Sequence, residues 1–543
     1  MLRGSVRRSD LITVAAAVLL ILPFYLKGIV SAYGTARPTD PDLLRDVGSA
    51  QAIIDGQYSE DPIYIGEKAW YPPLVSSFVA GLSTVTGLPV MTVATRAGIH
   101  LALLPVLALF GMLWCIFGRI AALGGLAGYL LLVNSGLPLW CDVGLSPHLF
   151  AICSLHGAFS LGLLLAWRIL RDPSLRWTNW AGAGALTGIT FLGHPSTALI
   201  LIILFGSIAL SDIIHALRAH GAIGPCIRNG LVYSLPTASA LIFLLAPLVK
   251  AYGMHSQNPY STTWQFAPIL FENVLHTLSK SMPALVVSGL GGAILLLRRD
   301  RTATIFLYAF SVVLAMFVWS SISSTLAQSA GRLVIPSFVP AYHFFFYLKL
   351  MCCMFFGIAV AWMGTLVYVR FSRMPMWRSL RLDAGVPIGH ILIGSGVCAI
   401  AITVVLCTPI FHSKVEEIRQ RAALSSRTDA HSAYLYVLHN TRPQEVFLTT
   451  DRVAMDVVSP AARKLVATDL YFSNPYVDPA PRRADRDAMF GLLAKGQVDE
   501  FLVSAKRYRV THIIPASTLP PVWDKWLSPV FSHGDISIYR LRY

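Results

Sequence analysis

Residues 39–46 read TDPDLLRD and residues 70–74 read WYPPL, and both follow the first long hydrophobic segment of the chain. Fourteen carboxylates precede residue 411, and seven of them lie between residues 34 and 71. The rest of this part of the chain largely avoids negative charge. Because ionisable groups beside a membrane are costly and are retained where they have a function, the cluster indicates chemistry.

The composition is that of an integral membrane protein with an additional water-soluble part. Apolar residues make up 55% of the 543 residues, charged residues make up 13%, and the mean hydropathy is +0.61. A water-soluble globular protein carries about twice that charged fraction. The first apolar stretch, residues 11–33, is long for a signal-peptide core and has no convincing cleavage site, so we expect a retained span.

The sequence predicts a polytopic α-helical membrane protein with about 11 transmembrane helices, taking about 20 apolar residues for each span. The predicted spans are 11–33, 90–117, 120–137, 148–168, 178–193, 196–214, 229–250, 282–297, 302–320, 343–369 and 387–410. The apolar stretch 72–88 is expected to lie on the outer surface. Pro195 is expected to separate two half-length spans.

The net charge of +15 is explained by topology rather than by nucleic acid. Sixteen arginines recur after every second span: Arg3, Arg7, Arg8, Arg119, Arg168, Arg171, Arg176, Arg218, Arg228, Arg298, Arg299, Arg301, Arg370, Arg373, Arg378 and Arg381. This is the positive-inside pattern, and it predicts a cytoplasmic N-terminus, with membrane lipids as neighbours. No nucleic-acid partner is expected.

Two domains are expected, a transmembrane domain at 1–410, whose first extracytoplasmic loop is 34–89, and a periplasmic domain at 411–543. The second has a soluble composition, with 18 basic and 14 acidic residues. Its pattern predicts strands at 446–449 and 510–514, a helix at 483–495 and a hairpin over 527–539, which is typical of a small α/β domain. It contains none of the eight cysteines, so it does not rely on disulfides.

The first 120 residues resemble the GT-C membrane glycosyltransferases, which include the oligosaccharyltransferase catalytic subunit, protein mannosyltransferases and the aminoarabinose transferase of lipid A. The matching elements are Asp40-Pro41-Asp42, Gly56 and Tyr71-Pro72-Pro73-Leu74. The remainder of the chain resembles the family only in layout. The resemblance implies an inverting transfer of a sugar from a polyprenyl-phosphate carrier to a periplasmic glycan, lipid or protein acceptor. Together with the arginine pattern, it implies a location in a bacterial inner membrane.

The acidic residues of the motif have the chemistry that this reaction needs, since a base must stand near the attacking hydroxyl or amide. Asp42 and Asp46 are four residues apart, so they share one face if Pro41 begins a helix. We expect Asp42 to act as the base, helped by Asp40 or Asp46. For Asp40 the alternative is a capping role at the start of that helix.

A divalent metal ion is a further expectation from the resemblance, because Asp40 and Asp42 are spaced like the paired acids through which some family members bind a cation. Oxygen ligands suit Mg²⁺ or Mn²⁺, and Asp142 on a second outer loop would add a ligand. Other family members work without metal. Asp142 is alternatively a cap for the turn that follows it.

The departing carrier phosphate needs cations at the outer ends of the spans. Arg332 is the residue we favour, and its alternative role is that of an interfacial arginine that reaches the headgroups. The remaining candidates are Arg96, Lys250 and Lys349, with His194, His255 and His343 as weaker ones. Arg96 alternatively pairs with a carboxylate of the first loop. Most aromatic residues at the outer boundaries, Tyr71 among them, are expected to be interface anchors.

Two other classes of function compete with the glycosyltransferase. One is a transporter or flippase of lipid-linked sugars, and the other is a non-catalytic membrane scaffold. Acidic residues in the middle of spans are nearly absent, which argues against proton-coupled transport. The sequence identifies neither the sugar nor the acceptor, because specificity depends on loop shape.

Overall fold

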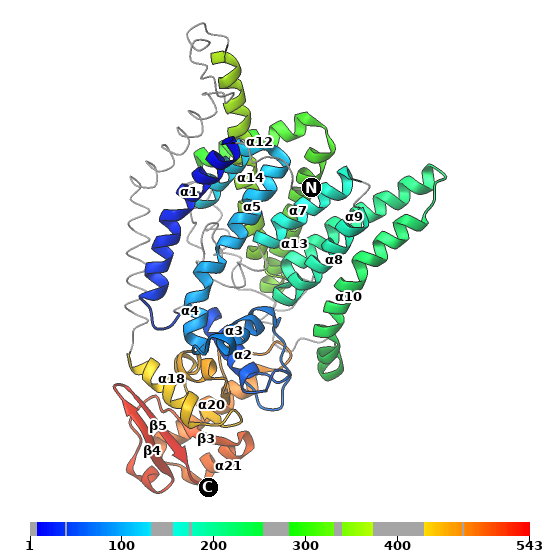
Figure 1. Ribbon diagram of the computed structural model, residues 1–543. Helices are drawn as coiled ribbons and strands as arrows, with labels where there is room; N and C mark the ends of the chain where they lie inside the picture. The colour runs from blue at the N-terminus through cyan, green and yellow to red at the C-terminus, as the bar shows by residue number, and fades with distance from the viewer. Residues whose placement is uncertain are drawn as a thin grey trace.

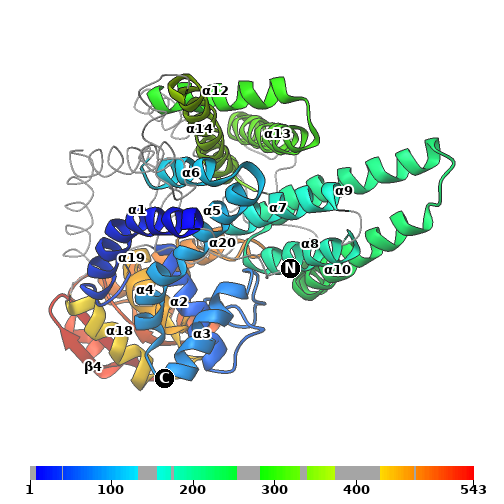
Figure 2. The ribbon, with the colours of Figure 1, turned by 45° about the horizontal axis from the view of Figure 1, so that its top comes forward.

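The computed structural model describes residues 8–38, 41–131, 156–172, 176–253, 282–330, 339–372, 428–469 and 472–543. A bundle of long helices forms one end of the molecule, and a small domain that contains the sheet forms the other (Figure 1). Two short helices of the first loop, α2 Pro41–Ile54 and α3 Leu74–Thr86, lie between these parts in Figure 1 and beside the C-terminal domain in Figure 2.

Long apolar helices dominate the bundle. Their bounds are α1 Arg8–Tyr33, α4 Val90–Leu101, α5 Leu103–Phe117, α6 Arg119–Leu131, α7 Gly157–Arg171, α8 Arg176–Gly193, α9 Pro195–Arg218, α10 Gly224–Tyr252, α12 Met282–Arg298, α13 Arg301–Ala330 and α14 Ala341–Ser372. Within the described residues, six helical segments are long and apolar enough to cross a membrane, counting α4 and α5 as one. The chain is therefore a polytopic membrane protein. The number eleven stays a prediction, since span 387–410 lies outside the described residues.

Small residues bring three bundle helices into close contact. A Cβ atom added to Gly357 of α14 would lie 2.5 Å from the backbone nitrogen of Gly125 on α6. One added to Gly291 of α12 would lie 1.9 Å from the carbonyl oxygen of Phe355. Because apolar burial gives little drive inside lipid, such close backbone packing is what holds membrane helices together.

The chain breaks between α8 and α9, as the Gly193-His194-Pro195 sequence predicts. His194 has extended backbone angles, φ −163° and ψ 134°, and Pro195 occupies the first position of α9, where its missing N–H costs nothing. The expectation that both helices here are half-length is wrong for α9. This helix continues for 24 residues to Arg218 and is long enough to span the bilayer.

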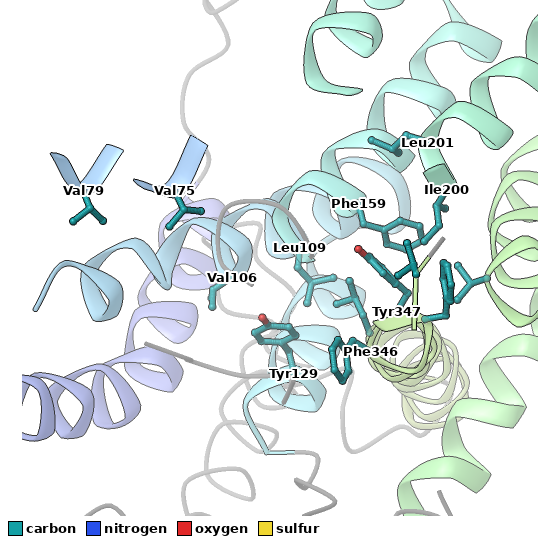
Figure 3. Close-up of a cluster of buried hydrophobic side chains, with 14 of the residues drawn as sticks. Val75, Val79, Val106, Leu109, Tyr129, Phe159, Ile200, Leu201, Phe346 and Tyr347 are labelled. Atoms are coloured by element: carbon teal, nitrogen blue, oxygen red, sulfur yellow. The ribbon is translucent and has the colours of Figure 1, made fainter. Parts of the chain in front are cut away.

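The first loop forms two short helices, α2 Pro41–Ile54 and α3 Leu74–Thr86. With 13 residues, α3 is too short to cross a bilayer, in agreement with its expected position at the surface. Its buried face carries Val75 and Val79, which belong to the same apolar core as bundle residues such as Val106 and Phe159 (Figure 3). The loop is thus packed onto the bundle.

The C-terminal domain has the α/β character that the sequence predicts. Its helices are α18 Thr428–Asn440, α20 Pro479–Lys495 and α21 Val498–Tyr508, and its strands are β1 Val446–Leu448, β2 Lys464–Leu465, β3 Val510–Ile513, β4 Leu527–His533 and β5 Ile536–Leu541. The five strands have the order β2-β1-β3-β5-β4, with β1 parallel to β2 and β3. Strands β4 and β5 form the predicted antiparallel hairpin. The expected boundary at residue 411 lies outside the described residues.

The first loop and the C-terminal domain are joined through their backbones. The amide of Leu465 in β2 donates to the carbonyl oxygen of Ile63 in the loop at 2.8 Å. A Cβ atom added to Gly48 of α2 would lie 2.2 Å from the carbonyl oxygen of Ser459. Because the two segments touch this closely, the loop and the domain lie on the same side of the membrane.

Candidate active site

Helix α2 carries the acidic pair that the sequence singles out. The helix begins at Pro41. Arg45 and Asp46 follow Asp42 by three and four residues, so the three side chains are neighbours on one side of the helix. All three side chains are buried, and Asp46 is only 1% exposed. The prediction that Asp42 and Asp46 share a face is confirmed, because both bind the same guanidinium.

Arg45 joins the two carboxylates. Its Nη1 donates to Oδ1 of Asp42 at 2.7 Å. Its Nε and Nη2 donate to Oδ1 of Asp46 at 3.2 and 3.0 Å. The guanidinium carbon lies 3.8 Å from the centroid of the Tyr71 ring, an arrangement that adds a cation–π contact and blocks one face from water.

Asp42, Arg45 and Asp46 form one charged unit, called here the α2 unit. It contains two acids and one base, so it carries a net negative charge when all three side chains are ionised. Burial raises the pKa of Asp46 to about 6; Arg45 opposes this rise and the charge of Asp42 adds to it. Burial likewise raises the pKa of Asp42, and Arg45 opposes it. Oδ2 of Asp46 is buried and has no hydrogen-bond partner among the described residues. An acid of this kind is poised to exchange a proton near neutral pH.

Two histidines of the bundle lie against one another. The rings of His194, at the α8–α9 junction, and His343, in the first turn of α14, have centroids 4.4 Å apart. Both side chains are buried. Burial, and after it the positive charge of Arg45, lowers the pKa of His194 to about 3. The imidazole of His194 is therefore neutral, and the charge of Arg45 contributes to keeping it so.

Hydrogen bonds fix the tautomer of His194. The backbone amide of Ser196 donates to Nδ1 at 3.2 Å, so Nδ1 is an acceptor and Nε2 carries the proton. The hydroxyl of Ser196 lies 2.8 Å from the same Nδ1 and 3.0 Å from the hydroxyl of Tyr347 on α14. This network makes His194 a rigid N–H donor.

Comparison with solved structures gives the fold a name. ArnT from Cupriavidus metallidurans superposes with a TM-score of 0.53 at 14% identity in the apo state, covering 97% of this chain and 98% of ArnT. ArnT bound to undecaprenyl phosphate gives 0.50, at 14% identity, over 96% and 97% of the two chains. The archaeal oligosaccharyltransferase AglB from Archaeoglobus fulgidus, in complex with an inhibitory peptide and a dolichol-phosphate, gives 0.50 at 12% identity over 93% of this chain and 69% of AglB.

This chain has the GT-C fold. No protein-family model and no curated protein matches the sequence. Nearly the whole chain superposes on ArnT, although the residues that match the GT-C motif are confined to the first loop. The fold prediction is therefore confirmed by arrangement in space where sequence identity is too low to show it.

Other residues expected at a GT-C site form no described contact with Asp42, Arg45 or Asp46, or lie outside the described residues. Arg96 is half-buried, with its guanidinium 5.1 Å from the Tyr33 ring, and it forms no described contact with a first-loop carboxylate. Lys250 is exposed in the last turn of α10. Asp40, Asp142, His255 and Arg332 fall in stretches that the structure does not describe. Their roles remain predictions.

The described residues do not make a ligand set for Mg²⁺ or Mn²⁺. They contain no group of three His, Cys, Asp or Glu side chains that could hold a metal ion. Asp42 directs one oxygen at Arg45, a cation that a metal would have to displace. Whether Asp40 and Asp142 complete a site is not decided by the described part of the chain, and metal dependence stays a prediction.

The other acids of the first loop do not lie with Asp42 and Asp46, although the sequence led us to expect chemistry from the whole acidic cluster. Asp55 pairs with Arg463 of the C-terminal domain at 2.8 Å. Asp61 is fully buried and accepts from the side-chain amide of Asn474 at 2.7 Å. Glu60 and Glu67 lie within 3.8 and 3.9 Å of Lys464 and Arg482, respectively. These four acids bind the C-terminal domain. A role in a reaction therefore cannot explain the whole acidic cluster of the first loop.

Arg45 and the role of Tyr71 were not anticipated from the sequence. The spacing Asp-x-x-Arg-Asp contains the signal for Arg45, because residues three and four apart on a helix are neighbours. The interface-anchor interpretation does not hold for Tyr71, whose ring lies against Arg45. No sequence rule would have paired two residues that are 26 positions apart in a loop.

Proposed function

We propose that this protein is an inverting GT-C glycosyltransferase that moves a hexose or pentose from a polyprenyl-phosphate carrier to a periplasmic glycan, lipid or protein acceptor. The observation that carries the proposal is the buried unit in which Arg45 binds the carboxylates of Asp42 and Asp46. The GT-C fold supports it, since ArnT and AglB have this fold and their structures contain undecaprenyl phosphate and dolichol-phosphate.

The unit has the parts that the chemistry requires. A carboxylate of the Asp42–Asp46 pair, with Asp42 favoured, takes the proton from the acceptor hydroxyl or amide, and the freed electron pair attacks the anomeric carbon of the sugar. The bond between that carbon and the carrier phosphate breaks, and the phosphate leaves with its electron pair. Attack from the side opposite the phosphate inverts the anomeric centre.

Arg45 and His194 support these steps without reacting. Arg45 holds both carboxylates in one geometry and, through its charge, favours their ionised forms. His194 is neutral, so the interaction that it offers a phosphate oxygen is an N–H hydrogen bond from Nε2 rather than a charge. Arg96, Lys250, Arg332 and His343 remain candidates for holding the carrier phosphate.

The proposed location is the bacterial inner membrane, with the N-terminus in the cytoplasm and the active site on the periplasmic face. Two features support this orientation. The arginine-rich turns recur after every second predicted span. The first loop and the C-terminal domain bind one another directly, so they must share a compartment.

Mass profiling of lipid-linked and envelope glycans in a deletion strain tests the proposal whatever the acceptor is. The strain is complemented with wild type, Asp42→Asn or Asp499→Asn, the last a matched change at an exposed site on α21. We expect deletion and Asp42→Asn to lack the same sugar, and Asp499→Asn to restore it. A flippase or scaffold would work with Asp42→Asn, so full restoration by that variant overturns the proposal.

A further inference from the structure

A second group of buried polar side chains lies far from the α2 unit, near the start of helices α8 and α10. The other end of α10 reaches the first loop, where the Tyr252 hydroxyl accepts from the backbone amide of Lys68 at 2.7 Å. Asn229 precedes Tyr252 by 23 residues along α10, which corresponds to about 35 Å. The hydrocarbon layer of a bilayer is about 30 Å thick. The group around Asn229 therefore lies at the membrane face opposite the first loop.

Close backbone contacts fix how α8 and α10 pair (Figures 1 and 2). A Cβ atom added to Gly184 of α8 would lie 2.3 Å from the carbonyl oxygen of Tyr233 on α10. One added to Gly188, a turn later in α8, meets the turn of α10 that follows Tyr233. The two helices therefore run parallel. A turn before these contacts, Trp180 of α8 and Asn229 of α10 lie at the same level.

Four polar atoms of this group are buried and have no hydrogen-bond partner among the described residues. They are Nε of Arg176, Nδ2 of Asn179, Nε1 of Trp180 and Oδ1 of Asn229. Trp180 is fully buried, and Asn179 and Asn229 are 8% and 5% exposed. A buried donor or acceptor of this kind destabilises the protein unless a bound molecule satisfies it.

The group is rich in donors and in positive charge. Arg176 forms an ion pair with Asp212 of α9, and the pair uses Nη2 rather than Nε. Arg218 and Arg228 are exposed at the ends of α9 and α10 that the chain joins on this side of the membrane. Guanidinium, amide and indole N–H groups together fit an anion and disfavour a cation.

Phospholipid headgroups have access to this level of the bundle. Trp177, which directly follows Arg176 in the first turn of α8, is 52% exposed. Ile227 of α10 is 55% exposed. Side chains of these types on the outside of a membrane bundle contact lipid at the boundary between acyl chains and headgroups. Basic sites between membrane helices on the arginine-rich side are typical binding sites for anionic headgroups.

We propose that Arg176, Asn179, Trp180 and Asn229 bind the headgroup of an anionic phospholipid from the leaflet opposite the first loop. The lipid phosphate accepts from the three N–H groups, and a headgroup hydroxyl, as in phosphatidylglycerol, donates to Oδ1 of Asn229. Donors and an acceptor at one level would bond to each other if they touched, so their separation leaves room for such a group. The site does not depend on the proposed function, because it lies at the other face of the membrane.

Titration of the purified, delipidated full-length protein with phosphatidylglycerol tests this site, with bound lipid measured by native mass spectrometry. We expect saturable binding to wild type and a loss of about tenfold or more in affinity in Asn179→Leu and Asn229→Leu, which replace an amide with an apolar group of similar shape. Trp180→Phe keeps an aromatic ring and removes the N–H, so it should weaken binding less. The matched control is Trp177→Phe, at the exposed position of the same helix, which should bind as wild type does.

The unfolding temperature gives a second readout that a purely structural role would not produce. Without lipid, Asn229→Leu should unfold at the wild-type temperature or above it, because it removes an unsatisfied buried amide. With phosphatidylglycerol it should unfold below wild type, because only wild type gains the bound headgroup.

Three outcomes would overturn the assignment. Equal affinity of wild type, Asn179→Leu and Asn229→Leu would show that these amides do not bind the lipid. Equal binding of phosphatidylcholine would show a site for bulk lipid, and displacement of the lipid by inorganic phosphate would show a site for the free anion. If a leucine variant does not elute as folded protein, Asn179→Ala and Trp180→Phe decide by the same comparison.

Discussion

At the scale of single residues, the proposed active site depends on one arginine between two aspartates. Arg45 uses three of its nitrogens to bind Asp42 and Asp46, and its flat face lies on Tyr71. A buried carboxylate without a partner would take up a proton, so the guanidinium is what allows two acids to be ionised side by side. The base is thus a property of three residues together.

Replacing Arg45 with Lys keeps the positive charge and removes the planar guanidinium that binds both carboxylates. A lysine ammonium cannot bind two carboxylates with planar geometry or stack on Tyr71, so we expect turnover to fall at least about tenfold, with the protein still folded. The measurement is the rate of sugar transfer from radiolabelled carrier in membranes with matched expression. Wild-type turnover in this variant would show that the reaction does not need the guanidinium geometry of Arg45.

The raised pKa of Asp46 predicts an acid limb in the pH–rate profile. Its pKa of about 6 lies above the ordinary value, so the carboxylate is ionised above pH 6 and protonated below it. Proton removal needs the ionised form, so transfer should decline as the pH falls through about 6. Because Asp42 and Asp46 titrate as a pair, the limb belongs to both, and Asp46→Asn should displace it. A rate that stays constant between about pH 5 and 8 contradicts this assignment.

At the scale of elements, α2 is placed by contacts at both of its faces. One face carries the charged unit, and the other meets the C-terminal domain at Ser459, where Gly48 allows direct backbone contact. Ala50 and Val47 of the same helix are fully buried. The helix therefore cannot move toward the bundle or away from it without losing packing on one side.

Gly48→Ala tests this placement. The added methyl group would meet the carbonyl oxygen of Ser459 at 2.2 Å, a clash that must separate α2 from the C-terminal domain. We expect a loss of about 1–3 kcal/mol in stability, seen as a lower unfolding temperature, together with reduced transfer.

The matched control is Gly81→Ala in α3, where no atom lies within 4 Å of the added Cβ. This change should be neutral or slightly stabilising, since alanine favours a helix over glycine. Equal unfolding temperatures for the two variants would show that the contact at Gly48 does not constrain the helix.

At the scale of the whole molecule, the first loop and the C-terminal domain act as one folded unit on the end of the bundle. Arg463 of the domain is 3% exposed and donates to Asp55 of the loop at 2.8 Å. The same guanidinium donates to the carbonyl oxygens of Leu438 and Thr441, each at 2.9 Å. Opposite charges thus join segments about 400 residues apart in the chain.

Arg463→Ala should destabilise this unit strongly. The change leaves the Asp55 carboxylate and several carbonyl oxygens without their donor, and breaking a buried pair of this kind costs about 3 kcal/mol or more. The readout is the unfolding temperature of the full-length protein in detergent. Arg442→Ala, at an exposed position of the same domain, serves as the control and should change it little. Similar unfolding temperatures for the two variants would mean that the Arg463–Asp55 pair does not hold the first loop to the C-terminal domain.

The sequence alone established the class of the protein and the position of its acids. Hydropathy, arginine placement and the Asp-Pro-Asp motif depend on neighbouring residues or on periodic spacing, and helix geometry then places Asp42 and Asp46 on one face. The C-terminal hairpin and strands were equally accessible, because alternation and turn residues are local signals.

Only the tertiary structure separates the acids that bind Arg45 from the acids that bind the C-terminal domain. Asp46 and Asp61 are both buried carboxylates of the same loop, yet one faces Arg45 and the bundle, whereas the other is bound by Asn474 of the distant domain. Likewise, His194 and His343 become neighbours only through helix packing across the bundle. A side chain's charge state and partners depend on what surrounds it in space, and that information is not contained in any local stretch of the chain.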